Sequence, residues 1–222
     1  MKHLLPAAGL AAVLLASGLP AAHATTINWG SPVLSTLVDS TGQQLDAGYH
    51  IQLGTFADSF VPTADNVADW GSNWRTFDEA SYDPEVGYFT GTADLKADGT
   101  SSSLDATLGV NFSGQPVFMW IYNDTGATEG SEWFLGRADS WVMPVASQDC
   151  CDSGLPAQWS TSDLSVSQTP VFGAQGPVIG GGSSSNPGNY TVQTYQVVPE
   201  PSAVLLSVIG MALLLRRRMP KD

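Results

Sequence analysis

Short runs of β-branched and aromatic residues, separated by turn residues, recur through the middle of this chain and constrain its fold more than any other feature. Such runs are typical of β-strands, and the Gly, Pro, Asn and Asp between them are typical of turns. The runs are YHIQLGTF (49–56), VGYFTGTA (86–93), LDATLGVNF (104–112), PVFMWIYN (116–123), EWFLGR (132–137) and NYTVQTYQVV (189–198). We therefore expect a mainly β body, built as an antiparallel β-sandwich, with a jelly roll as one arrangement that the pattern allows.

Three stretches add detail to this expectation. PVFMWIYN is apolar at consecutive positions, as in a central strand that is covered on both faces. NYTVQTYQVV alternates, so that Tyr190 and Val192 would share one face of a strand and Thr191 and Tyr195 the other. The Gly- and Ser-rich residues 173–189 predict a flexible loop before that final strand, with a stalk as the alternative.

Residues 62–77 break the strand pattern. Val67, Trp70, Trp74 and Phe77 follow one another at steps of three and four, which is helical spacing. The two tryptophans allow two interpretations: a platform on which sugars stack, or one side of a short helix that covers the end of a sheet. We favour the covering helix.

The ends of the chain differ in composition from the body. Residues 1–24 combine a basic start, an apolar run and small residues before a cut after Ala24, as in a secretory signal peptide. The remaining body, 25–198, is long enough for one domain with a substantial core. It carries 19 acids against three basic residues, a formal net charge of −16. Such a surface repels phosphate backbones, so we expect no nucleic-acid partner.

The last 24 residues contain an apolar run from Ser202 to Leu215, followed by Arg216, Arg217 and Arg218. As a helix the run would span about 21 Å, less than the ~30 Å hydrocarbon core of a bilayer. The arginines would stop transfer and stay on the cytoplasmic side. Residues 199–222 therefore predict a marginal C-terminal membrane helix, acting as a weak anchor or as a sorting signal.

Pro199, Glu200 and Pro201, followed by SAVLLSVIGMALLLRRR, resemble the C-terminal sorting domain of exported bacterial PEP-CTERM proteins. The resemblance covers about residues 198–218. It implies export through the inner membrane, transient anchoring by the C-terminal helix and processing near the tripeptide by a membrane protease of the exosortase type. The mature protein would then lie at the cell surface or outside the cell, among extracellular polysaccharide. The resemblance predicts a route and leaves the activity of the body open.

Cys150 and Cys151 are adjacent, and export would place them where disulfides persist. Neighbouring cysteines close no large loop, so a bridge between them adds little chain-entropy stabilisation. The acids at 149 and 152 disfavour thiolate reactivity, and a C-x-x-C redox spacing is absent. We expect a local structural role, either as a strained vicinal disulfide or as two reduced thiols, with pairing between chains as the third option.

ADLKADGTSSSLD (93–105) spaces Asp94, Asp98 and Asp105 in the manner of an EF-hand loop, with Gly99 at the sharp turn. Lys96 occupies a ligand position, however, and the expected flanking elements are strands. We expect a hairpin turn first and a weak calcium site second. No other cofactor is predicted.

Catalytic constellations are scarce in the body. His50 is its one histidine. A His-rich zinc site is therefore excluded, and a Ser-His-Asp triad would have to use His50. A glycoside hydrolase needs only two carboxylates, and Asp78, Glu79, Asp83 and Glu85 cluster along residues 77–89. We interpret that cluster first as a solvated acidic turn.

Two functions from different classes follow from these observations. The first is an exported, non-catalytic protein of the cell surface or extracellular matrix, with carbohydrate binding as one role that its Trp, Tyr and Asp content allows. The alternative is a secreted hydrolase that acts on glycans with paired carboxylates. A cleft with two carboxyl groups about 5–9 Å apart would favour the alternative.

Overall fold

The structure is a computed structural model, and it describes residues 24–33, 35–145, 156–164, 170–176 and 191–198. This part of the chain is mainly β with little helix, as expected. Its helical elements are the 3-10 helices η1 (Ala64–Asp69) and η2 (Thr161–Asp163) and the single α-helical turn α1 (Trp70–Asn73). Its strands are β1 (Thr25–Gly30), β2 (Thr36–Val38), β3 (His50–Phe56), β4 (Trp74–Asp83), β5 (Tyr88–Leu95), β6 (Phe118–Tyr122), β7 (Glu132–Gly136), β8 (Ala157–Ser160), β9 (Ala174–Gln175), β10 (Thr191–Gln193) and β11 (Tyr195–Gln196).

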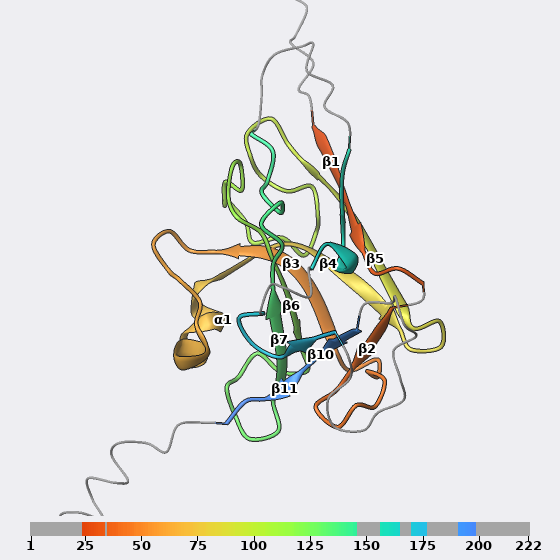
Figure 1. The fold of residues 1–222 in the computed structure, drawn as a ribbon. Coiled ribbons are helices and arrows are strands. Elements are labelled where there is room, and N and C mark those ends of the chain that lie inside the picture. Colours follow the sequence, from red (N-terminus) through yellow and green to blue (C-terminus); the bar gives the residue numbers. More distant parts are fainter. Residues whose placement is uncertain (1–23, 34, 146–155, 165–169, 177–190, 199–222) are drawn as a thin grey trace, which may run out of the picture.

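The strands form one long, curled sheet and one small sheet (Figure 1). The long sheet has the order β11-β7-β6-β3-β4-β5-β1-β8, and the small sheet has the order β2-β10-β9. Most neighbours are antiparallel, as expected, but β1 pairs with β8 and β2 pairs with β10 in parallel. The sheets are therefore mixed rather than purely antiparallel, because these pairs join segments far apart in the chain instead of the two arms of a hairpin.

Strands β6 and β7 lie at the centre of the hydrophobic core. Every residue of both strands is buried. Met119 and Ile121 pack into one cluster of apolar side chains, whereas Trp120 and Tyr122 pack into a second cluster on the opposite face. The first cluster also holds Leu37 and Val192 of the small sheet, and the second is covered by α1. The expectation of a central strand covered twice is confirmed.

The helix expected over residues 62–77 is shorter than its apolar spacing suggested. It ends at Asn73, and Trp74 turns to extended backbone and begins β4 by pairing with Phe56. Trp70 is fully buried and its ring stacks on Trp133 at 5.5 Å. The interpretation of Trp70 and Trp74 as a sugar-stacking platform is therefore wrong, and the covering helix is confirmed. All seven tryptophans of the chain are buried.

Other expected strands differ in detail. Residues 104–112 form turns rather than a strand, with Leu104 and Leu108 fully or almost fully exposed. The expected strand 189–198 is divided at Thr194: β10 joins the small sheet and β11 joins the long one. Strand β9 lies at the start of the expected loop 173–189. The strands β1, β2, β4 and β8 were not expected: β2 has only three residues, and polar residues interrupt the apolar patterns of the other three.

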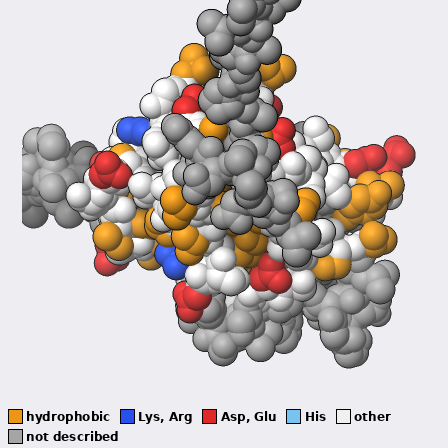
Figure 2. Space-filling view, turned by 90° about the horizontal axis from the view of Figure 1, so that it is seen from above, with side chains coloured by type: hydrophobic (Ala, Val, Ile, Leu, Met, Phe, Trp, Pro, Cys, Tyr) orange, Lys and Arg blue, Asp and Glu red, His pale blue; other side chains and the backbone are white. Residues whose placement is uncertain are grey.

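Several predictions fall on residues that the structure does not describe. They are the leader (1–24, of which only Ala24 is described), Cys150 and Cys151, most of the loop 173–189 and the sorting tail 199–222. Among the described residues, no helix is both long and apolar enough to cross a membrane. On the face seen in Figure 2, acidic side chains are spread over the surface and basic ones are few.

Candidate functional site

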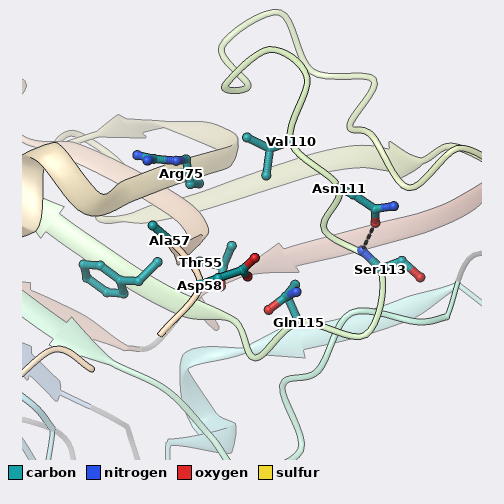
Figure 3. Close-up of a pocket in the computed structure, with 9 residues that line it drawn as sticks. Thr55, Ala57, Asp58, Arg75, Val110, Asn111, Ser113 and Gln115 are labelled. Atoms are coloured by element: carbon teal, nitrogen blue, oxygen red, sulfur yellow. Dashed lines mark hydrogen bonds between the residues drawn. The ribbon is translucent and has the colours of Figure 1, made fainter. Parts of the chain in front are cut away.

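A polar hollow of about 640 Å³ lies where β3 ends and β4 begins, beneath the loop that connects β5 to β6. Figure 3 shows Arg75 of β4 on one side, Asn111, Ser113 and Gln115 of the loop on the other, and Asp58 between them. Hydroxyl, amide and carboxylate groups therefore line one space, and Arg75 borders it. Its volume falls in the range of small-molecule sites.

A second hollow, of about 250 Å³, adjoins the first around the turn that follows β3. The two share Thr55, Phe56, Ala57, Asp58 and Gln115. The second hollow adds Phe60, Phe118 and Arg137 to its lining. We call the two together the arginine groove, because Arg75 and Arg137 are the only arginines of the body 25–198.

Backbone carbonyls hold the guanidinium of Arg75. Its Nη1 donates to the carbonyl oxygens of Ser72 and Trp74 at 3.0 and 2.8 Å. Within the described part of the chain, Arg75 forms no ion pair with a carboxylate. The pairing of β3 with β4 shifts register between Leu53 and Gly54, just before the two strands reach the groove. Such a bulge bends a strand and re-aims the side chains next to it.

Arg137 is held in a different way. Its guanidinium carbon lies 5.5 Å from the centre of the Phe118 ring, a cation–π distance. Its Nη2 lies 3.8 Å from Oδ1 of Asp139, a side chain that is 86 % exposed. Exposed ion pairs contribute little, so Asp139 does not fix Arg137 strongly.

The predicted calcium segment forms a hairpin turn, as expected. Lys96 N–H donates to Thr100 O and Gly99 N–H donates to Lys96 O, both at 2.8 Å. Gly99 has a φ of +81°, the left-handed conformation that such turns require. The turn then continues into the loop of the groove, where Phe112 N–H donates to Gly99 O at 2.8 Å.

The three aspartates of that segment serve local contacts. Asp94 accepts a hydrogen bond from the Thr26 hydroxyl at 2.7 Å, on the strand before the turn. Asp98 accepts both the hydroxyl and the N–H of Thr100, and these bonds lower the pKa of its carboxyl. Asp105 follows in the loop. No group of three metal-ligating side chains occurs among the residues that the structure describes, and the calcium site stays a prediction.

Asp78, one of the four clustered acids, is buried and accepts a hydrogen bond from the Trp29 indole at 2.7 Å. The indole reaches it from β1 by crossing β5 at Gly91, where a Cβ would clash with Trp29 Nε1 and lie 2.9 Å from the Asp78 carboxylate. Asp78 therefore has a structural partner, and Gly91 makes room for it.

Glu79 follows Asp78 in β4 and so points to the opposite face of the sheet. There its carboxylate contacts His50 Nδ1 at 2.7 Å and accepts from the Gln52 amide at 2.8 Å. The His50 ring stacks on Tyr122. This pair orients an exposed imidazole, but His50 lines none of the hollows described above or below.

Asp83 is the last residue of β4, and Glu85 lies in the exposed turn that leads to β5. The Asp83 carboxylate accepts the Glu85 N–H at 2.9 Å, which closes the turn locally. The four acids thus divide among a buried position, a half-buried position on the opposite face of the sheet and a turn, and the interpretation of the cluster as a solvated acidic turn is wrong for Asp78 and Glu79. They do not form one carboxylate pair in a cleft.

Glu132 forms a buried polar site that the sequence analysis missed. It is 7 % exposed, and its carboxylate accepts the N–H and hydroxyl of Ser40 at 3.0 and 2.5 Å. Tyr49 and Thr194 hydroxyls donate to it at 2.9 and 2.7 Å. Burial raises the pKa of this carboxyl, but the hydrogen bonds outweigh burial and place the pKa below its ordinary value. The pKa of Tyr49 is raised, first by burial and then by its bond to Glu132.

Comparison with known proteins adds no relative: no protein-family model, no curated protein and no solved structure matches this chain.

Proposed function

We propose that this chain is an exported, non-catalytic protein of the cell surface or extracellular matrix, and that it binds carbohydrate in the arginine groove. The observation that carries the proposal is the groove itself, a hollow lined by hydroxyl, amide, carboxylate and guanidinium groups. Such groups form the hydrogen bonds that sugar hydroxyls require. The proposed route of export is supported by the leader and by the resemblance of residues 199–218 to PEP-CTERM sorting tails.

The same geometry supports binding over hydrolysis. A glycosidase needs two carboxyl groups that face one another across a cleft. The groove contains Asp58 as its one acid, and the acids at 78 and 79 lie on opposite faces of the sheet. The alternative, a secreted hydrolase acting on glycans, has no comparable support in the described residues.

We expect the full-length protein, purified in detergent, to bind polysaccharides on a glycan array, with and without calcium, and to release no new reducing ends from the glycans it binds. Removal of calcium tests the weak site at Asp94, Asp98 and Asp105. Failure to bind any glycan would contradict the proposed function, and steady hydrolysis would favour the alternative.

We expect processing at the tripeptide to leave a mature C-terminus between residues 198 and 201. The folded body extends almost to the motif: Val197 is buried and its N–H donates to Ser131 O at 2.7 Å. Cleavage before this residue would require β11 to detach from β7, whereas Val198 is 79 % exposed.

Mass spectrometry of the protein recovered from cells checks this expectation. A variant with Pro199-Glu200-Pro201 replaced by three alanines serves as the control and should retain Asp222. An intact C-terminus in the wild-type surface form would leave a simple anchor in place of a processing signal.

Three structural features belong to the same proposal. The two-layer sandwich is supported by the apolar cluster that residues of both sheets share. The cleaved leader and the marginal C-terminal helix rest on the sequence pattern, with residues 216–218 as the membrane stop and an exosortase-type protease as the partner. A local structural role for Cys150 and Cys151 rests on their adjacency.

A further inference from the structure

We propose that the glycan bound in the arginine groove is anionic, and that Arg75 and Arg137 bind its carboxylate groups. The inference rests on the proposed function, because it names the class of carbohydrate for the same site. Uronic acids are the simplest sugars that carry such a carboxylate.

Charge distinguishes this groove from two other hollows in the part of the chain that the structure describes. The hollow over β1, β5 and β8 contains Asp163 as its one charged residue, and the hollow beside η1 contains Asp65 and Asp69. The arginine groove contains two arginines against Asp58. A body with a net charge of −16 and three basic residues thus has two of them lining one groove.

Arg75 is prepared for a carboxylate before any ligand arrives. The carbonyls of Ser72 and Trp74 occupy its Nη1 and fix the guanidinium plane. The edge formed by Nε and Nη2 has no partner among the described residues, and this edge matches a carboxylate in a bidentate pair. Because the guanidinium is already ordered, binding costs less side-chain entropy.

Arg137 offers a second cation in the adjoining hollow, which shares Ala57 and Asp58 with the hollow that Arg75 lines. Its guanidinium is placed against the Phe118 ring, and its contact with exposed Asp139 is weak enough for a ligand carboxylate to replace. Two cations along one groove suit a polymer that carries repeated carboxylates better than a neutral sugar. Thr55, Asn111 and Gln115 remain for ring hydroxyls.

The negative charge of the rest of the body does not prevent this. Charges separated by more than about 8 Å are largely screened at physiological salt. The balance inside the groove therefore decides which ligand binds, and Asp58 can accept a hydroxyl instead of facing a carboxylate.

The test uses a linear polyuronate as the probe and the same polymer with its carboxyls reduced to alcohols as the matched ligand. We expect the full-length protein to bind the polyuronate at least tenfold more tightly than the reduced polymer. Arg75→Gln should weaken polyuronate binding about tenfold and leave the reduced polymer unaffected. Arg75→Lys should give an intermediate loss, because it keeps the charge and removes the planar fork.

Lys96→Gln is the control, since it removes the third cation of the body from an exposed turn and changes the net charge equally. Circular dichroism and thermal unfolding test whether each variant folds. If Arg75→Gln does not fold, Arg137→Gln takes its place in the binding experiment. Equal losses for Lys96→Gln and the arginine variants would overturn the inference. Binding of both polymers alike, without dependence on the arginines, would also overturn it but leave carbohydrate binding intact. No binding of either polymer or of any array glycan would overturn both.

Discussion

Replacement of Glu132 by Gln is expected to lower the free energy of unfolding by about 3 kcal/mol. The wild-type carboxylate accepts four hydrogen bonds from neutral donors, and each donor is oriented for an acceptor. An amide of the same shape keeps one oxygen but brings an NH₂ group against donors that then lack a partner. Because the site is buried, water does not compensate for the loss.

Thermal unfolding followed by circular dichroism measures this effect, and a loss of about 3 kcal/mol corresponds to roughly 10 °C in a domain of this size. Glu129→Gln is the matched control, because Glu129 lies three residues earlier and is exposed. We expect that variant to unfold within about 0.5 kcal/mol of the wild type. Equal stability of the two variants would show that the Glu132 network contributes nothing.

The network also predicts the pH dependence of stability. The pKa of Glu132 is lower in the folded than in the unfolded chain, so its contribution is complete above the ordinary carboxyl pKa and disappears as pH falls through the folded value. Tyr49 affects stability at alkaline pH. Because its pKa is raised in the folded chain, its contribution is complete below the ordinary tyrosine pKa and decreases as pH rises above that pKa. Glu132→Gln should therefore flatten the acid side of the stability curve.

The position of Glu132 explains why sequence patterns did not identify it. EWFLGR was correctly predicted as a strand, but an acid at the start of a strand is usually exposed. Its donors come from residues 40, 49 and 194, and nothing in a local pattern brings those segments together. Glu132 also pairs with Gln196 where β11 joins β7, and this pairing holds the last strand of the body in place.

Local patterns predicted the elements better than their connections. Local patterns and turn residues were sufficient for four strands: β6 and β7 contain continuous apolar runs, and β3 and β5 carry aromatic and β-branched residues between turn residues. They failed at residues 62–77, where helical spacing continued into β4. Pairing with Phe56 of β3 decides the conformation of Trp74, and that pairing is long-range. They failed again at Thr194, where one run supplies two sheets.

The candidate site was the least predictable part. The arginines were visible in the sequence as two of three basic residues, but their meeting at one groove depends on the end of β3, the loop from β5 to β6 and the chain after β7. The clustered acids at 78–85 were conspicuous in sequence and dispersed in space, because consecutive strand residues point to opposite faces.

We expect Gly54→Ala to destabilise the protein by about 3 kcal/mol and to disturb the arginine groove at the same time. Gly54 lies where β3 and β4 change register, opposite Thr76. A Cβ there would clash with the backbone oxygen of Arg75 and lie 2.7 Å from the Trp74 ring. A backbone atom cannot turn aside as a flexible side chain can, so β4 itself would have to move.

Gly71→Ala provides the matched control for this change. Its Cβ would have Thr125 O at 3.5 Å as its nearest neighbour, an ordinary contact, and it lies in the short helix α1. Alanine is the better helix former, so this variant should be neutral or more stable by up to about 1 kcal/mol. Chemical denaturation of both variants separates the two outcomes, with polyuronate binding as the second readout. A movement of the Arg75 backbone must change both the strand pairing and the guanidinium, which the carbonyls of Ser72 and Trp74 hold. Equal stability and equal binding of Gly54→Ala and Gly71→Ala would therefore show that the close approach of β3 to β4 is unimportant.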